Sequence, residues 1–234
     1  MIVAVAGGKG GVGKSTMALN LGAELGAVVV DADLAAADLP AGSGRGPDLH
    51  DVLVGRATPL DAVDSTGPVR LLPCGRTLEG ARASDLAELP RVVDALDRRY
   101  GRVVVDCPAG LARDVGVQLA SADAAVLVTT PSKVAIHDAY RTRQLTLALE
   151  TPLAAVVVNR SRSRRDERLL DPVERHFGAP AVRVETRPAV AEAQSMGRPL
   201  RTVAPACPAL DALETLSRVI ERRARRYSEH VETL

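Results

Sequence analysis

Large aromatic side chains are almost absent from this sequence, which has no tryptophan, one phenylalanine and three tyrosines in 234 residues. Alanine, valine and leucine must therefore build most of the core, and a hydrophobic content of 46% in a chain of this length is enough to do so. Long apolar runs are also lacking. No stretch approaches the roughly 18 apolar residues of a membrane-spanning helix. The apolar run at the N-terminus is too short for a signal peptide.

Cysteine is scarce, and its spacing excludes two classes of protein. Cys74, Cys107 and Cys207 are odd in number and widely separated, and no pair forms a CxxC motif. The sequence therefore favours neither a disulfide framework nor a cysteine metal knuckle, and it fits a reduced cytoplasm. We interpret Cys107 as a structural thiol, with a redox role as the open alternative.

Net charge is nearly absent too. Lys plus Arg number 30 and Asp plus Glu 29, so no global charge attracts nucleic acid or an anionic membrane. Lysine is the rarest cation, because only Lys9, Lys14 and Lys133 are present and all other basic residues are arginine. Two of these three lysines lie in one glycine-rich loop. A compact ammonium enters a crowded phosphate site more easily than a planar guanidinium does, so both lysines are predicted to have a chemical role.

That loop is the strongest motif of the chain. The segment Gly8-Lys9-Gly10-Gly11-Val12-Gly13-Lys14-Ser15 follows an apolar run over residues 2–6 and precedes a helical pattern over residues 16–25. Strand, glycine loop and helix in this order predict a phosphate-binding loop, with Lys14 reaching the β- and γ-phosphates and the Ser15 hydroxyl on Mg²⁺. The glycines let backbone N–H groups wrap a phosphate at the positive end of a helix.

Two further apolar runs each end in an aspartate. Residues 28–31 end in Asp31, with Asp33 two positions later, and residues 103–106 end in Asp106. Parallel strands place their ligands at the carboxyl edge, where these carboxylates suit a hydrated Mg²⁺ and an attacking water. A Pro-Ala-Gly turn follows the second run.

The remaining pattern alternates strands with helices. We predict further strands at 69–72, 124–130, 153–158 and 182–185, and helices at 84–99, 134–149 and 209–226. This alternation predicts an α/β fold of the P-loop NTPase type, with a mainly parallel sheet of seven or eight strands and helices on both faces. Residues 40–69 form a surface excursion in which His50 is expected to be solvent-exposed. The whole chain, 1–234, is predicted to be one P-loop domain, with a nucleotide-binding core over 1–205 and a C-terminal helix and tail over 206–234.

An asparagine follows the strand predicted at 153–158. The amide of Asn159 offers a donor and an acceptor, which suits the edge of adenine. The guanine-specific pattern Asn-Lys-x-Asp is not met, since Asn159 is followed by Arg160, Ser161 and Arg162. The sequence therefore predicts ATP rather than GTP.

The segment Lys-Gly-Gly-Val-Gly-Lys-Ser-Thr at 9–16 resembles the deviant phosphate loop of the MinD/ParA family of ATPases, and the chain is closest in pattern to MinD-like members. In that family the first lysine reaches the nucleotide of the partner subunit. The resemblance therefore implies that Lys9 acts across an ATP-dependent homodimer, with ATP and Mg²⁺ as cofactors. The ATP site would include Gly8, Lys9, Gly10, Gly11, Val12, Gly13, Lys14, Ser15, Thr16, Asn159 and Arg160.

Other roles are implied by the same resemblance. Asp33 would orient or activate the hydrolytic water, so that Lys9, Lys14 and Asp33 are the predicted catalytic residues. Asp31, Asp33 and Asp106 would meet the metal through water. Pro108 and Gly110 would form the switch that senses the γ-phosphate, and Asp38-Leu39 would belong to a second switch-like stretch. The segment that includes Arg187 would frame the base.

These observations lead to one function and several alternatives. We predict a slow, partner-stimulated ATPase that acts as a cytoplasmic dimerisation switch in positioning cell division or other structures, with a protein activator or cargo. A ParA-type protein would instead bind DNA through the arginines of 160–168. An iron–sulfur carrier of the same superfamily would need paired cysteines at a dimer axis, and the sequence lacks CxxC. A third alternative is a nucleotide-gated scaffold with negligible hydrolysis. Peripheral binding to a membrane surface also stays open, although the tail 227–234 is acidic and lacks the apolar face of the MinD membrane helix.

Overall fold

Seven parallel strands form one sheet in the order β3-β2-β4-β1-β5-β6-β7. The computed structural model describes residues 1–34, 37, 39, 46–111 and 113–231, and the side chains of 164, 165 and 224–231 lie outside that description. The predicted α/β fold with a parallel sheet is confirmed, with seven strands. Their bounds are Ile2–Ala6 (β1), Val28–Asp31 (β2), Arg70–Leu72 (β3), Val103–Asp106 (β4), Ala124–Thr129 (β5), Leu153–Ser161 (β6) and Ala181–Glu185 (β7).

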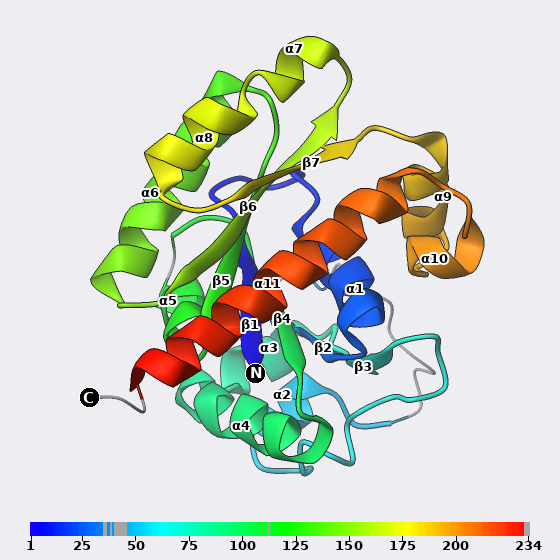
Figure 1. The fold of residues 1–234 in the computed structure, drawn as a ribbon. Coiled ribbons are helices and arrows are strands. Elements are labelled where there is room, and N and C mark those ends of the chain that lie inside the picture. Colours follow the sequence, from blue (N-terminus) through cyan, green and yellow to red (C-terminus); the bar gives the residue numbers. More distant parts are fainter. Residues whose placement is uncertain (35–36, 38, 40–45, 112, 232–234) are drawn as a thin grey trace.

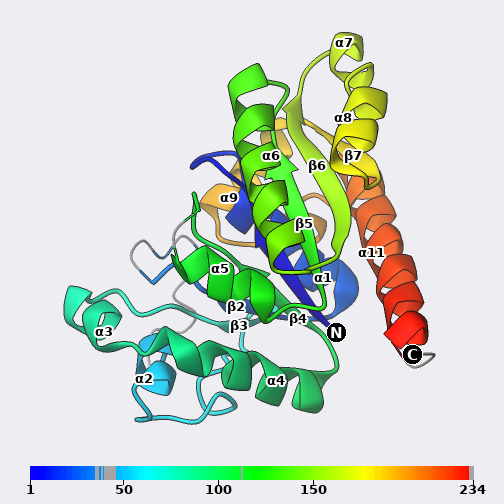
Figure 2. The same cartoon turned by 90° about the vertical axis from the view of Figure 1, so that its left-hand side faces the viewer.

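Helices cover both faces of the sheet (Figures 1 and 2). One face carries α1 (Lys14–Leu25), α9 (Pro188–Ser195), α10 (Leu200–Val203) and the long α11 (Ala209–Val231), which crosses the sheet diagonally in Figure 1. The other face carries α4 (Leu89–Tyr100), α5 (Arg113–Ala120), α6 (Lys133–Ala148) and α8 (Leu170–Phe177). The short elements are α2 (Leu49–Leu53), α3 (Leu78–Ala83), η1 (Leu86–Glu88) and α7 (Arg164–Glu167).

Small aliphatic side chains fill both layers of the core, as the shortage of aromatics predicts. Successive strand residues point to opposite faces. In β2, Val29 packs beneath α1, in the same core cluster as the buried face of α11, whereas Val28 and Val30 pack on the other side. Phe177 is the one aromatic side chain among the largest fully buried residues of the described chain.

His50 contradicts its prediction, because only 3% of it is exposed. The Asp48 side chain caps α2, and the Leu49 N–H donates to the Pro73 carbonyl at 2.9 Å, so this helix folds back onto the end of β3. The His50 ring then lies within hydrogen-bonding distance of a thiol, with 3.5 Å between its Nε2 and the Cys74 Sγ. The excursion is thus packed against the sheet here rather than solvated.

Two predicted helices have different limits. The helix expected over 84–99 is divided into η1 and α4, because the Asp85 side chain accepts from the Ala87 N–H and begins a separate turn. The last helix continues to Val231 instead of ending at Arg226. No helix in the described part of the chain combines the length and apolar character needed to cross a membrane.

Candidate functional site

The glycine loop joins the central strand β1 to α1 at the carboxyl edge of the sheet. Gly11 and Gly13 have φ of +74° and +99°, values that favour glycine. A Cβ added at Gly8 would lie 2.1 Å from the backbone oxygen of Asp138, and one at Gly7 would lie 2.6 Å from that of Val128. The loop is therefore pressed against neighbouring backbone, in a shape that side chains would obstruct. A cradle of this kind at the start of a helix fits the phosphates of a nucleotide.

The two lysines of the loop face different environments. Lys14 opens α1 and is buried, with 7% of its surface exposed, whereas Lys9 is exposed. Ser15 and Thr16 follow Lys14 in the first turn of α1. Lys14 therefore points into its own subunit, and Lys9 is accessible from outside it.

Asn159 at the end of β6 supports this loop. Its Nδ2 donates to the Val12 carbonyl at 2.8 Å, and its Oδ1 accepts from the Arg160 N–H at 2.9 Å. Arg160 has φ of +57°, at a point where the register between β6 and β7 shifts. The assignment of Asn159 to the adenine edge stays a prediction, and its amide already braces the phosphate loop.

Asp31 and Asp106 are neighbours on the adjacent strands β2 and β4, and each is 1% exposed. The Asp31 carboxylate accepts backbone hydrogen bonds from Asp33 at 3.3 Å and from Leu39 at 3.1 Å. Asp31 thus organises the turn that carries Asp33, which is half-buried. Asp38, expected in the same switch-like stretch as Leu39, lies outside the described residues.

The turn after β4 lies beside the phosphate loop. A Cβ added at Gly10 would lie 4.0 Å from the Cβ of Ala109. Ala109 is the middle residue of the segment Pro108–Gly110, and Gly110 has φ of +98°. The predicted switch is therefore next to the loop. Burial and then the charge of Asp106 raise the pKa of the Cys107 thiol far above its ordinary value, which favours the protonated thiol.

Two adjoining cavities flank the loop. The larger, of about 360 Å³, is lined by residues of the loop and α1 together with Leu39, Arg160, Gln194, Gly197 and Arg198. The smaller, of about 200 Å³, reaches Asn159, Thr186 and Arg187. Arg187 is half-buried and forms an ion pair with Glu185, whose pKa is lowered by Arg187 and then Arg183.

The sequence analysis missed three polar side chains that line the larger cavity: Asn20, Gln194 and Arg198. Asn20 lies one turn after Thr16 on α1, and its Nδ2 donates to the Thr16 carbonyl at 2.7 Å. Its Oδ1 accepts from the Leu200 N–H at 2.8 Å, which ties α10 to the nucleotide-binding helix. The spacing of four residues between Thr16 and Asn20 was a signal that could have revealed this contact.

The donor set suits magnesium bound mainly through water. Within the described ranges, no group of three or more His, Cys, Asp or Glu side chains is arranged to hold a metal ion. Mg²⁺ in nucleotide sites keeps several waters and takes few protein ligands besides phosphate oxygens. The Ser15 hydroxyl and the carboxylate of Asp106 fit such a site.

Comparison with known proteins agrees with this geometry. A family model described as the CobQ/CobB/MinD/ParA nucleotide binding domain matches residues 3–200. Two uncharacterized ATP-binding proteins of Methanocaldococcus jannaschii are similar: one is 40% identical over 170 residues, covering 68% of this chain, and the other is 32% identical over 222 residues, covering 90%. The matches cover 64% and 84% of the two relatives, so the chain spans less than two thirds of the first.

Solved structures of similar shape include two MinD proteins. The cell division ATPase MinD of Pyrococcus furiosus has a TM-score of 0.84 and 30% identity, with 94% of this chain and 98% of that one covered. The septum site-determining protein MinD of Pyrococcus horikoshii, complexed with Mg-ADP, has a TM-score of 0.85 and 27% identity, with coverages of 97% and 98%. The chain belongs to the CobQ/CobB/MinD/ParA family of nucleotide-binding domains.

Proposed function

We propose that this chain is an ATP-hydrolysing switch of the MinD type, which forms a homodimer when ATP is bound and separates after hydrolysis. The observation that carries the proposal is the contrast between the two loop lysines. Lys14 is buried beside the phosphate cradle, whereas Lys9 is exposed on the same loop. In a chain that uses arginine for nearly every cation, an exposed lysine here suits a partner's phosphates.

Each residue then has a distinct task. The loop N–H groups and Lys14 would hold the phosphates, and the Ser15 hydroxyl would be a direct ligand of Mg²⁺. Asp106 would hold a water of the metal, and Asp33 would orient the attacking water. When bound, Mg²⁺ would supply positive charge that offsets the charge on the phosphoryl oxygens. Lys9 of the partner subunit adds positive charge where the transition state needs it, so each site is completed by dimerisation.

The turn after β4 supplies the response to hydrolysis. Ala109 lies against Gly10, so a γ-phosphate above the loop would contact the segment Pro108–Gly110. Because Gly110 has a positive φ, the turn depends on a residue with unusual backbone freedom. Loss of the γ-phosphate would release this turn and weaken the dimer.

The test compares three variants in an Asp33→Ala background, which slows hydrolysis. Lys9→Ala should bind ADP within about threefold of the parent, since Lys9 is exposed and lines neither cavity beside the loop, but should not dimerise with ATP. Lys9→Arg keeps the charge and should also stay monomeric, because a planar guanidinium does not replace an ammonium in a crowded phosphate site. Lys14→Ala should lose nucleotide binding itself.

Light scattering after size-exclusion chromatography gives the oligomeric state. ATP-dependent dimers of Lys9→Ala would overturn the cross-subunit role. Phosphate release by the unmodified chain, measured alone and with cell lysate, distinguishes a slow, partner-stimulated ATPase from a scaffold with negligible hydrolysis.

The second part of the proposal is the surface or partner to which the ATP-bound dimer binds. We propose a cytoplasmic protein with a protein activator or cargo, and peripheral binding to a membrane surface is the alternative that MinD-type positioning would require. The ParA-type alternative is favoured by the exposure of Arg160, Arg162 and Arg168 near α7. The side chains of Arg164 and Arg165, expected in the same basic stretch, lie outside the described residues.

Co-pelleting of the Asp33→Ala variant with anionic liposomes or with DNA, each in ATP and in ADP, distinguishes membrane binding from DNA binding. ATP-dependent binding to liposomes supports membrane positioning. Salt-sensitive binding to DNA that an Arg162→Ala/Arg168→Ala variant loses supports the ParA-type function. If the variant binds neither liposomes nor DNA, membrane binding is refuted and a protein is the remaining binding partner.

A further inference from the structure

Gln118 links α5 to the turn that carries the predicted water-activating acid. Its side chain is 0% exposed, and its Nε2 donates to the Ala32 carbonyl at 2.8 Å, across 86 residues of sequence. Ala32 lies between Asp31 and Asp33. A hydrogen bond to this carbonyl therefore fixes the peptide plane from which Asp33 departs.

The same turn is held from a second side. The Ala32 N–H donates to the Asp106 carbonyl at 3.1 Å, so both polar groups of the Ala32 backbone are bound by the segment 106–118. That segment contains the Pro108–Gly110 turn beside the phosphate loop. A displacement of this turn that moves α5 would consequently pull on Ala32.

The amide of Gln118 is costly for stability alone. Its Oε1 is buried and accepts no hydrogen bond from the described residues. A buried acceptor without a donor is unfavourable, whereas an apolar side chain of similar length would fill the space without that loss. The donor contact to Ala32 is thus the contribution that an apolar residue could not make.

We propose that Gln118 is a positioning residue, which holds the Ala32 carbonyl so that the Asp33 carboxylate faces the attacking water and follows movement of the Pro108–Gly110 turn. This inference rests on the proposed ATPase function, in which Asp33 orients that water. It adds a residue to the reaction that touches neither nucleotide nor metal. Its effect is on the chemical step and not on binding.

The test is Gln118→Met, which keeps the length of the side chain and removes the donor. A small displacement of a catalytic group lowers turnover strongly, so kcat should fall about tenfold while the Kd for ADP stays within about twofold. The matched control is Thr151→Val. It removes the buried 2.9 Å hydrogen bond from the Thr151 hydroxyl to the carbonyl of Leu119, which is on α5 but makes no hydrogen bond to Ala32 in the described part of the chain. Thr151→Val should lower kcat by no more than its loss of thermal stability explains.

A double-mutant cycle shows whether Gln118 acts through Asp33. In the Asp33→Ala background, Gln118→Met should leave the residual rate unchanged, because there is no carboxylate left to position. An equal loss in both backgrounds, or an equal loss of kcat in Thr151→Val, would overturn the inference. Unchanged kcat in Gln118→Met would also overturn the role of Gln118, without affecting the proposed ATPase function. Absence of turnover in the unmodified chain would instead refute the proposed ATPase itself.

Discussion

The side-chain amide of Asn159 donates a 2.8 Å hydrogen bond to the carbonyl of Val12, which lies 147 residues earlier in the phosphate loop. The end of β6 thus fixes the loop that follows β1. Its Oδ1 accepts from the Arg160 N–H, so both ends of the amide are used within the subunit. This relationship gives Asn159 a role in shaping the phosphate site, whether or not it also meets the base.

Replacing Asn159 by alanine should weaken binding of the phosphates themselves. Loss of a buried hydrogen bond costs about 1–3 kcal/mol, and part of that loss should appear as roughly tenfold weaker binding. Isothermal titration with ATP and with inorganic tripolyphosphate makes the comparison. If Asn159 supports the loop, the alanine variant has a lower affinity for both ligands. If Asn159 only contacts the base, the variant has a lower affinity for ATP alone. Unchanged tripolyphosphate binding would therefore contradict the bracing role.

A methyl group at Gly8 should abolish nucleotide binding. The added Cβ would meet the backbone of Asp138 at 2.1 Å, and backbone cannot rotate away as a side chain can. The control is Gly116→Ala on α5, where a Cβ has no neighbour within 4 Å and alanine favours the helix by about 0.5–1 kcal/mol. Fluorescent ADP binding and thermal unfolding distinguish the two variants. Normal ADP affinity in Gly8→Ala would show that the loop does not need this contact.

Asp31 and Asp33 should differ in their effects on stability. The Asp31 carboxylate accepts from two backbone N–H groups, and an asparagine amide would present a donor to one of them. Asp31→Asn should therefore lower the free energy of unfolding by about 1–3 kcal/mol. Asp33→Asn, at a half-buried position, should lower it less and should chiefly reduce hydrolysis. Urea unfolding of both variants checks the order, and a larger loss in Asp33→Asn would contradict it.

The three cysteines should differ in reactivity. Burial is the main cause that raises the pKa of the Cys74 and Cys107 thiols far above the ordinary value of about 8.5. Nearby carboxylates, led by Asp31 for Cys74 and by Asp106 for Cys107, raise these pKa values further. Only the thiolate is alkylated, so iodoacetamide should modify half-exposed Cys207 first, and the other two only in denaturant. Peptide mass spectrometry identifies the modified residue, and rapid native labelling of Cys107 would revive its redox role.

The phosphate loop and the fold were predictable because their signals are local. Spacing of glycines and lysines defines the segment around Lys14, and short valine-rich runs define strands. The burial of His50 was not predictable, since it depends on α2 folding back onto the end of β3. The role of Gln118 was not predictable either, because its partner Ala32 is 86 residues away in the sequence.

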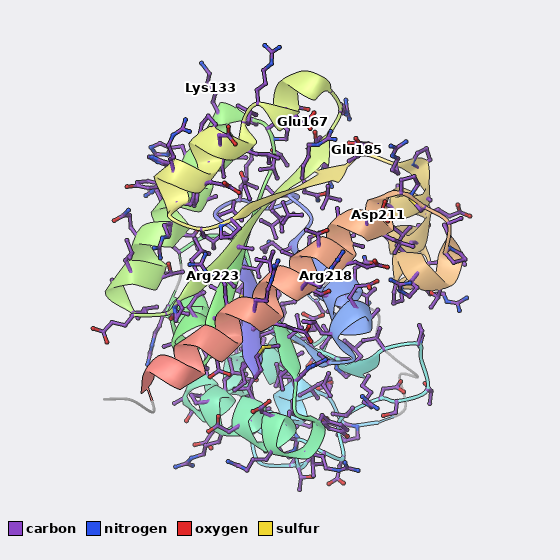
Figure 3. All side chains as sticks on the ribbon, viewed as in Figure 1. Lys133, Glu167, Glu185, Asp211, Arg218 and Arg223 are labelled. Carbon is purple, nitrogen blue, oxygen red and sulfur yellow. The ribbon has the colours of Figure 1, made fainter. Side chains whose placement is uncertain are left out.

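The arginines show a different limit. Their density over 160–168 predicts a basic surface, but the sequence could not show which ones pair with acids. Arg183 and Arg187 share Glu185. Arg162 and Glu167 instead line a third cavity, distinct from the two beside the phosphate loop and also of about 360 Å³. Glu167 and Glu185 lie at the end of the molecule that bears α7, and Arg218 and Arg223 lie along α11 (Figure 3). Pairing of charges is a property of the folded arrangement.

The wall that confines the phosphate loop consists of the main-chain oxygens of Val128 and Asp138. Main-chain atoms do not change with residue identity. Side chains along the outer face of α6 can therefore diversify without altering the shape of the cradle. A chain of this kind can acquire a new partner on that helix while its nucleotide chemistry remains the same.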